Sequence, residues 1–106
     1  MMHIGVVDYR IRSTGNAFDA VWYSTSLGTK DTGTGIAKGD TSNGFPGKYI
    51  ITYFRPDGSE VGNFELTIEK TGPIYDLSWN KDGKQLFVGV GIDTSEGMAA
   101  GFRKVE

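Results

Sequence analysis

Side chains that commonly act in catalysis or bind metals are scarce in this chain of 106 residues. It contains one histidine, His3, and no cysteine. A serine-type catalytic triad needs a histidine base, and most zinc sites use several histidine or cysteine ligands. Disulfides and thiolate sites also require cysteine. We therefore predict no histidine triad, no metal site and no cofactor.

Carboxylates are the remaining candidates for acid–base chemistry. Asp8, Asp19, Glu65 and Asp76 lie in β-prone segments, and a carboxylate buried in an apolar interior has a raised pKa that suits proton transfer. Charged residues on strands mostly face solvent, however, and this explains all four without any catalytic role. We assign no catalytic residue and expect a non-catalytic protein. A histidine-independent cyclase or isomerase is an alternative that requires Asp19, Glu65 or Asp76 inside the fold.

Aromatic residues combined with Gly-x-Gly pairs indicate either core packing or a binding platform. The pairs at 33–35 and 89–91 each remove two successive side chains from one face of a strand, and Trp22 and Trp79 each precede a pair by one strand. Such bare backbone lets an indole lie flat on it. Core packing is the first interpretation, because aromatic side chains bury large areas. In the ligand-binding alternative, the predicted lining residues are Trp22, Tyr53, Tyr75, Trp79 and Phe102.

Two arginines at matched positions could bind an anion. Arg55 and Arg103 each follow a phenylalanine at the end of a β-prone segment. If both segments end at the same rim of the fold, the two guanidinium groups could hold an anionic group there. The alternative is that each arginine simply ends its strand with a charge.

The elements that must position these residues are all predicted to be strands. Alternating apolar and polar residues mark half-buried strands, and turn residues such as Pro56-Asp57-Gly58 and Asp82-Gly83 separate them. No segment has helical periodicity. We predict an all-β, eight-stranded antiparallel up-and-down barrel, which leaves no free sheet edge, with a two-sheet β-sandwich as the alternative. The predicted strands span 2–12, 17–24, 32–38, 47–55, 59–70, 74–80, 85–92 and 97–105.

An internal repeat supports the barrel. Segments 8–55 and 64–103 both contain, in the same order, a tryptophan, a Gly-x-Gly-Ile and a Phe-Arg pair. The loop at 39–46 in the first copy corresponds to a tighter turn at 94–97 in the second, and length changes of this kind concentrate in loops. We therefore predict one domain over 1–106, built from two similar halves.

Composition limits the partners and the location that we expect. The net charge is −2 with both signs interspersed, whereas a nucleic-acid-binding domain needs a basic face. No apolar run is long enough to span a bilayer, and the N-terminal residues do not resemble a signal peptide. We expect no nucleic-acid partner, no membrane association and a cytoplasmic location.

Several predicted strands are apolar on both faces, for example at Ile50-Ile51 and Leu86-Phe87. A barrel needs apolar residues only on its inner face. Extra apolar residues on the outer face indicate a surface that another subunit covers. We therefore predict a homodimer.

The number of strands, the glycine and tryptophan usage and the hairpin spacing together resemble the calycin group of small barrels, which includes lipocalins and avidins. The resemblance covers the whole chain and is one of architecture. Ala20 and Leu77 stand two positions before the tryptophans, where the lipocalin signature has glycine, so no family residue is carried over. The resemblance implies a site inside the barrel or at its rim for a small apolar or amphipathic molecule.

The leading hypothesis is a non-catalytic module that binds such a small molecule. The second hypothesis is a structural or interaction protein, possibly a glycan-binding one that uses exposed aromatic residues and the loop at 40–45. The cyclase or isomerase described above is the third hypothesis. The binding module requires an interior cavity, the glycan-binding protein requires an exposed aromatic surface, and the cyclase or isomerase requires a buried carboxylate.

Overall fold

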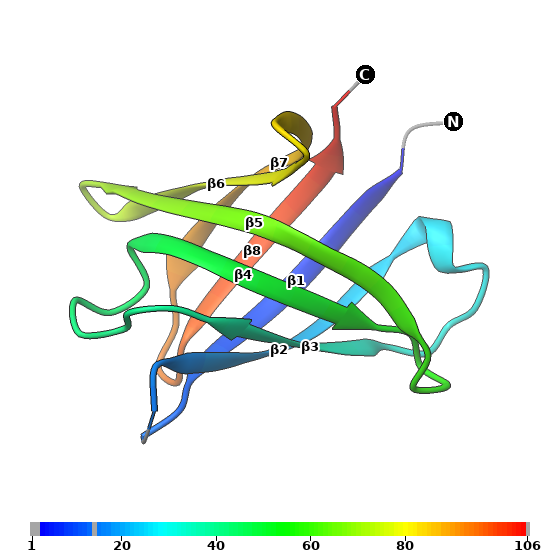
Figure 1. Cartoon of the computed structure of the whole chain (residues 1–106), viewed down its shortest axis with the longest axis horizontal. Coiled ribbons are helices and arrows are strands. Elements are labelled where there is room, and N and C mark those ends of the chain that lie inside the picture. The colour runs from blue at the N-terminus through cyan, green and yellow to red at the C-terminus, as the bar shows by residue number, and fades with distance from the viewer. Residues whose placement is uncertain (1–2, 14, 106) are drawn as a thin grey trace.

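The computed structural model describes residues 3–13 and 15–105, and it confirms the predicted barrel. Each strand pairs in antiparallel fashion with the next, and β1 pairs with β8, so the sheet closes on itself (Figure 1). The sandwich alternative is therefore wrong. A short 3-10 turn, η1 (Thr25–Leu27), follows the second strand. The strands are β1 (Ile4–Ile11), β2 (Ala17–Ser24), β3 (Gly33–Lys38), β4 (Gly47–Phe54), β5 (Glu60–Thr71), β6 (Ile74–Lys81), β7 (Lys84–Asp93) and β8 (Met98–Lys104).

The observed strand bounds lie within two residues of those predicted, because turn residues such as Asp82 and Gly83 adopt the positive φ angles that end strands. Met2 of the first predicted strand and Thr14 of the following turn lie outside the described residues. Within the described part of the chain, no helix has the length and apolar character needed to cross a membrane.

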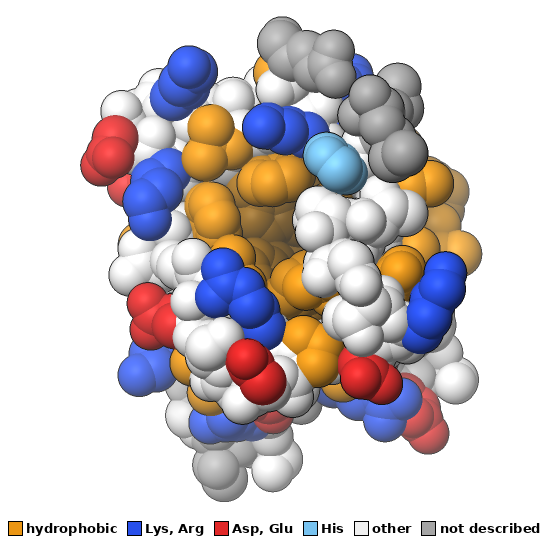
Figure 2. All heavy atoms as spheres, turned by 90° about the vertical axis from the view of Figure 1, so that its right-hand side faces the viewer, with side chains coloured by type: hydrophobic (Ala, Val, Ile, Leu, Met, Phe, Trp, Pro, Cys, Tyr) orange, Lys and Arg blue, Asp and Glu red, His pale blue; other side chains and the backbone are white. Residues whose placement is uncertain are grey.

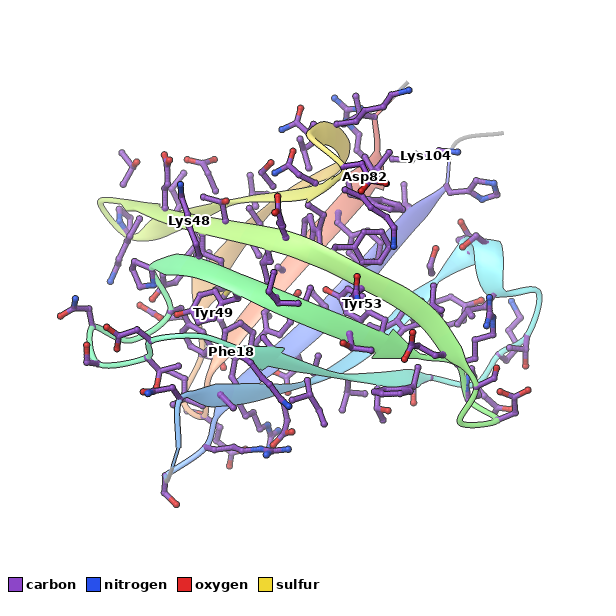
Figure 3. The ribbon with its side chains drawn as sticks, viewed as in Figure 1. Phe18, Lys48, Tyr49, Tyr53, Asp82 and Lys104 are labelled. Atoms are coloured by element: carbon purple, nitrogen blue, oxygen red, sulfur yellow. The ribbon has the colours of Figure 1, made fainter. Side chains whose placement is uncertain are left out.

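Aromatic side chains close one end of the barrel. The Phe18 ring lies at its centre and makes edge-on contacts with the rings of Tyr9, Tyr49 and Phe45, at centroid distances of 4.9, 4.7 and 5.5 Å. The loop at 39–46 folds inward here, and the Tyr49 hydroxyl donates to the carbonyl oxygen of Phe45 at 2.9 Å. We call this the closed end; Figure 3 shows Phe18 and Tyr49 there, away from Tyr53.

The glycan-binding hypothesis, which names exposed aromatic residues and the loop at 40–45, stays a prediction. Within this loop, Phe45 is only 6 % exposed and belongs to the core. Its burial has a physical reason, because without it the end of an eight-stranded barrel would leave the Phe18 ring in contact with water.

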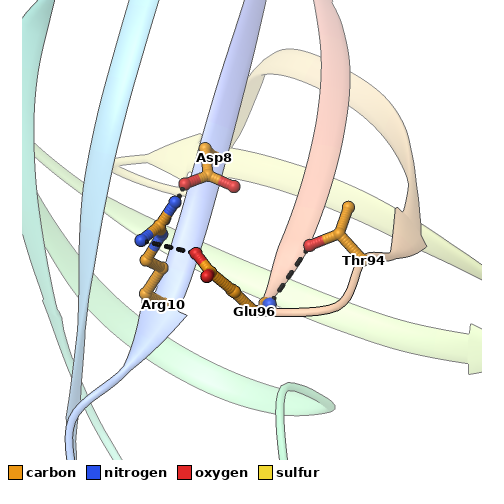
Figure 4. Close-up of polar contacts among 5 residues, drawn as sticks. Asp8, Arg10, Thr94 and Glu96 are labelled. Atoms are coloured by element: carbon orange, nitrogen blue, oxygen red, sulfur yellow. Dashed lines mark hydrogen bonds and ion pairs between the residues drawn. The ribbon is translucent and has the colours of Figure 1, made fainter.

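The seam between the first and last strands depends on a close backbone approach at Gly97. A Cβ atom at Gly97 would overlap the carbonyl oxygen of Tyr9, so the turn between β7 and β8 can reach β1 only with glycine there. Arg10 of β1 pairs with Glu96 across the same seam at 2.9 Å, and with Asp8 on its own strand at 3.0 Å (Figure 4). These ion pairs are exposed to solvent, so they contribute little to stability.

As predicted, each tryptophan packs on the neighbouring Gly-x-Gly pair, but it contacts only the first glycine of that pair closely. The Trp22 indole lies over Gly33, and the Trp79 indole lies over Gly89. The second glycines have other neighbours: Gly35 lies under the Tyr53 ring, and a side chain at 91 would meet Met98. The two tryptophans also differ in their strand pairing. Trp22 pairs with Gly33 on β3, whereas Trp79 pairs with Phe87 on β7.

Apolar side chains also extend along the outer face of neighbouring strands. Val6 on β1 and Val90 on β7 are each 60 % exposed, and they stand on either side of Gly101 on β8, which pairs with both. Ile4 and Ile92 extend the same surface. The predicted excess of apolar residues on the outer face is therefore present, while the homodimer stays a prediction.

Candidate functional site

The end of the barrel opposite Phe45 is hollow. A cavity of about 100 Å³ opens there, and Figure 2 shows the hollow with hydrophobic side chains on its walls and basic side chains around its mouth. We call this the open end. Strands β2, β4, β5, β6, β7 and β8 and the turn η1 each contribute to the wall. The lining residues are Trp22, Ser24, Ser26, Tyr53, Val61, Phe64, Trp79, Phe87 and Phe102.

The structure brings together four of the five predicted lining residues. Trp22, Tyr53, Trp79 and Phe102 all line this cavity. The Trp22 and Tyr53 rings meet edge-on with centroids 5.6 Å apart, and the Trp79 and Phe102 rings also lie 5.6 Å apart. Tyr75 lies elsewhere: its ring contacts Phe45 at the closed end, at 6.1 Å.

Three polar hydrogens meet at the inner end of the cavity. The indole N–H of Trp79 donates to the hydroxyl oxygen of Tyr53 at 2.7 Å, and this oxygen lies 2.7 Å from the hydroxyl oxygen of Tyr9. Burial raises the pKa of Tyr53 and of Tyr9 well above the usual tyrosine value, so both hydroxyls keep their protons at neutral pH. The site therefore combines an apolar wall with a hydrogen-bonding group at its base.

Two serines give the mouth of the cavity a smaller polar area. Ser24 ends β2 and is only 5 % exposed, and its hydroxyl accepts from the backbone N–H of Ser26 and lies 2.9 Å from that serine's hydroxyl. This is the capping pattern that starts a short helical turn. The Trp22 indole N–H donates to the carbonyl oxygen of Thr34 at 2.8 Å, so this indole presents only its apolar surface to a ligand.

The rim of the open end carries basic side chains. Lys81 extends over the ring of Phe64, with its Nζ 5.4 Å from the ring centroid, and donates to the carbonyl oxygen of Asn63. Cation–π contacts of this kind hold an ammonium group beside an aromatic wall. The ion pairs found among the described residues lie around the closed end and involve Arg10, Arg12 and Lys70.

The arginines of the predicted anion site lie in or next to strands that line the cavity, and each has its own hydrogen-bond partner. Arg55 follows β4, and its guanidinium donates to the carbonyl oxygen of Glu60 at 2.8 Å within the turn. Arg103 of β8 pairs with Ile4 and Val88, and it borders a shallow outer groove. An anion site at the rim stays a prediction.

The carboxylates named in the cyclase hypothesis lie outside the barrel. Asp19, Glu65 and Asp76 are exposed, and Arg12 lowers the pKa of Asp19 through a hydrogen-bonded ion pair on the surface. Asp8 is half-buried and pairs with Arg10. The requirement for one of these carboxylates inside the fold is not met, so that part of the hypothesis is wrong. Their interpretation as residues of a solvated face is correct.

Tyr75 predicts a change of stability at alkaline pH. Burial, together with a 2.6 Å hydrogen bond to Asp93, raises the pKa of Tyr75 to about 12, whereas an unfolded tyrosine ionises near pH ~10. Because the folded state holds this proton more tightly, the stabilisation is complete below the unfolded pKa and is lost as the pH rises through the folded pKa. Urea unfolding between these two values should therefore show a steeper fall in stability for wild type than for Tyr75→Phe. If stability fell equally steeply with pH in both proteins, the raised pKa of Tyr75 would be contradicted.

Five residues of the cavity wall were not predicted. Phe64 could have been found, because it alternates with Leu66 and Ile68, which are both buried. Phe87 lies in a run of apolar residues that gives no signal of which side faces inward. Val61, Ser24 and Ser26 reach the cavity from strand ends and the turn η1, where alternation does not apply.

Comparison with known proteins adds no family to this description: no family model, curated protein or solved structure matches the chain. Within residues 3–13 and 15–105, no group of three histidine or acidic side chains converges as metal ligands would. What the site can do must therefore be argued from its own geometry.

Proposed function

We propose that the protein is a non-catalytic binding module that takes a small apolar or amphipathic molecule into the open end of the barrel. The observation that carries this proposal is a cavity walled by aromatic side chains and closed at its base by packed core residues. Ligand sites are typically concave and mostly apolar, with a few placed polar groups. The calycin resemblance supports the same function, since barrels of that group hold small apolar molecules inside or at the rim.

The size of the cavity limits the ligand. A volume of about 100 Å³ is below that of an apolar cavity of roughly 150 Å³, which is known to accept benzene. The mouth is open, however, so that a larger molecule can insert one ring and leave the remainder in solvent. The ligand, or its inserted part, is therefore a single ring or a group of similar size.

Titration with benzene tests this proposal, because the indole N–H resonances of Trp22 and Trp79 report on the cavity wall. Val61 lines the cavity at its mouth and is 39 % exposed, so Val61→Phe should narrow the entrance without disturbing the core. We expect this variant to weaken benzene binding by at least about tenfold, because the larger side chain would occupy part of the space that benzene needs.

Val90→Phe is the matched control, because it makes the same side-chain change on the outer face, where Val90 is 60 % exposed. This variant should bind benzene as wild type does. If benzene at its solubility limit shifted neither indole resonance of the wild type, the binding proposal would be wrong. Equal affinity in both variants would place the binding site elsewhere.

A further inference from the structure

We propose that the Tyr53 hydroxyl is a free hydrogen-bond donor at the base of the cavity, and that the ligand carries a neutral acceptor atom, such as a ring nitrogen or a carbonyl oxygen, on its buried edge. This inference rests on the proposed binding function and adds the chemical class of the ligand. It follows from counting the hydrogens of Tyr9, Tyr53 and Trp79.

Three polar hydrogens are available for only two hydrogen bonds among Tyr9, Tyr53 and Trp79. The indole N–H of Trp79 is used in its contact with the Tyr53 oxygen, and the contact between the two hydroxyls uses the hydrogen of only one of them. Among the described residues, neither hydroxyl has another acceptor within hydrogen-bond distance. One O–H hydrogen, on Tyr9 or on Tyr53, is therefore left over.

Burial decides which hydroxyl keeps the spare hydrogen. Tyr9 is 0 % exposed, and its ring is enclosed by the core around Phe18, so an unused donor there would be a buried unsatisfied group, which is destabilising. Tyr53 lines the cavity together with Trp79, whose indole meets its hydroxyl. The favoured arrangement has Tyr9 donating to Tyr53, while Tyr53 accepts twice and offers its own hydrogen to the cavity.

The surroundings define the acceptor that this hydrogen would take. The wall near Tyr53 is made of aromatic rings, including Phe64 at 6.0 Å and Trp22 at 5.6 Å. An anion in this position would lose its hydration for a single neutral donor, which is unfavourable. A neutral acceptor on a flat apolar ring loses much less, so it is the class of ligand that the site favours.

Benzene and pyridine form a suitable pair of probes, because they match in shape and only pyridine carries an acceptor. Tyr53→Phe alone would free the Trp79 indole N–H, which is a second donor on the cavity wall. The affinities should therefore be measured by calorimetry for wild type, Tyr9→Phe, Trp79→Phe and the double variant Trp79→Phe/Tyr53→Phe. We expect the ratio of pyridine to benzene affinity to fall by about tenfold from Trp79→Phe to the double variant, which is the upper range for one neutral hydrogen bond. In Tyr9→Phe the ratio should change by less than about twofold, since Tyr53 keeps its free hydrogen.

The ¹⁵N chemical shift of labelled pyridine gives a second readout. Hydrogen bonding should move it upfield in wild type, Tyr9→Phe and Trp79→Phe, and this movement should be absent in Trp79→Phe/Tyr53→Phe. A ratio that is the same in Trp79→Phe and in the double variant would overturn the assignment of the donor. A ratio that rises in Tyr9→Phe would also overturn it, because Tyr53 would then be donating to Tyr9 in wild type. Failure of both probes to bind wild type would instead contradict the proposed function itself.

Discussion

Replacing Phe18 by alanine is expected to lower the free energy of unfolding by about 3–5 kcal/mol, the usual cost of truncating a buried phenylalanine. Phe18 is 0 % exposed and contacts three other aromatic rings, so that its loss would leave a cavity at the closed end. Backbone pairing of β2 with both neighbouring strands limits the collapse that could fill this space. Urea unfolding followed by circular dichroism measures the change.

Phe54→Ala is the matched control for Phe18→Ala. Phe54 pairs with the exposed Thr34 and therefore stands on the outer face of β4. Truncation there leaves no internal cavity, and we expect a loss of about 1 kcal/mol or less. Equal losses in the two variants would show that the aromatic cluster at the closed end does not contribute the stability that its packing implies.

Replacing Gly97 by alanine is expected to destabilise the protein by about 3 kcal/mol, the upper range for overpacking at a rigid site. The added methyl group would overlap the Tyr9 carbonyl oxygen. That atom belongs to the backbone of β1 and cannot rotate away as a side chain would. The turn must therefore move, and this movement would strain the pairing of β1 with β8 that closes the barrel. The thermal midpoint of unfolding should fall accordingly.

Gly101→Ala makes the same glycine-to-alanine change within β8 and is the control. A methyl group there would have only the Gly5 carbonyl oxygen nearby, at 3.9 Å. Without a clash, exchange of glycine for alanine within a strand is neutral or stabilising, by up to about 1 kcal/mol. If Gly97→Ala were as stable as Gly101→Ala, the seam would be more adaptable than its geometry indicates.

Local sequence patterns were enough to predict the number, order and approximate bounds of the strands. Alternation of apolar and polar residues and the turn residues between strands are local properties, and the antiparallel barrel follows from eight short strands in succession. Trp22, Tyr53, Trp79 and Phe102 line one cavity, and the bare glycine backbone beside each tryptophan was the local signal for the two indoles. Their role in binding stays a prediction. Asp19, Glu65 and Asp76 were correctly interpreted as surface residues, because charged residues on strands mostly face solvent.

Local patterns did not show which end of the barrel is closed or which residues share the cavity, because both depend on contacts between distant segments. Phe45 turns inward from a loop, and Tyr75 lies at the closed end, because the strands fill the two ends unequally. Register shifts at Tyr53/Phe54 and Trp79/Asn80 change which side chains face inward. Phe102 lines the cavity, whereas Phe54, its counterpart in the predicted repeat, stands on the outer face. The register shifts depend on pairing between distant segments, which the order of residues along one strand does not contain.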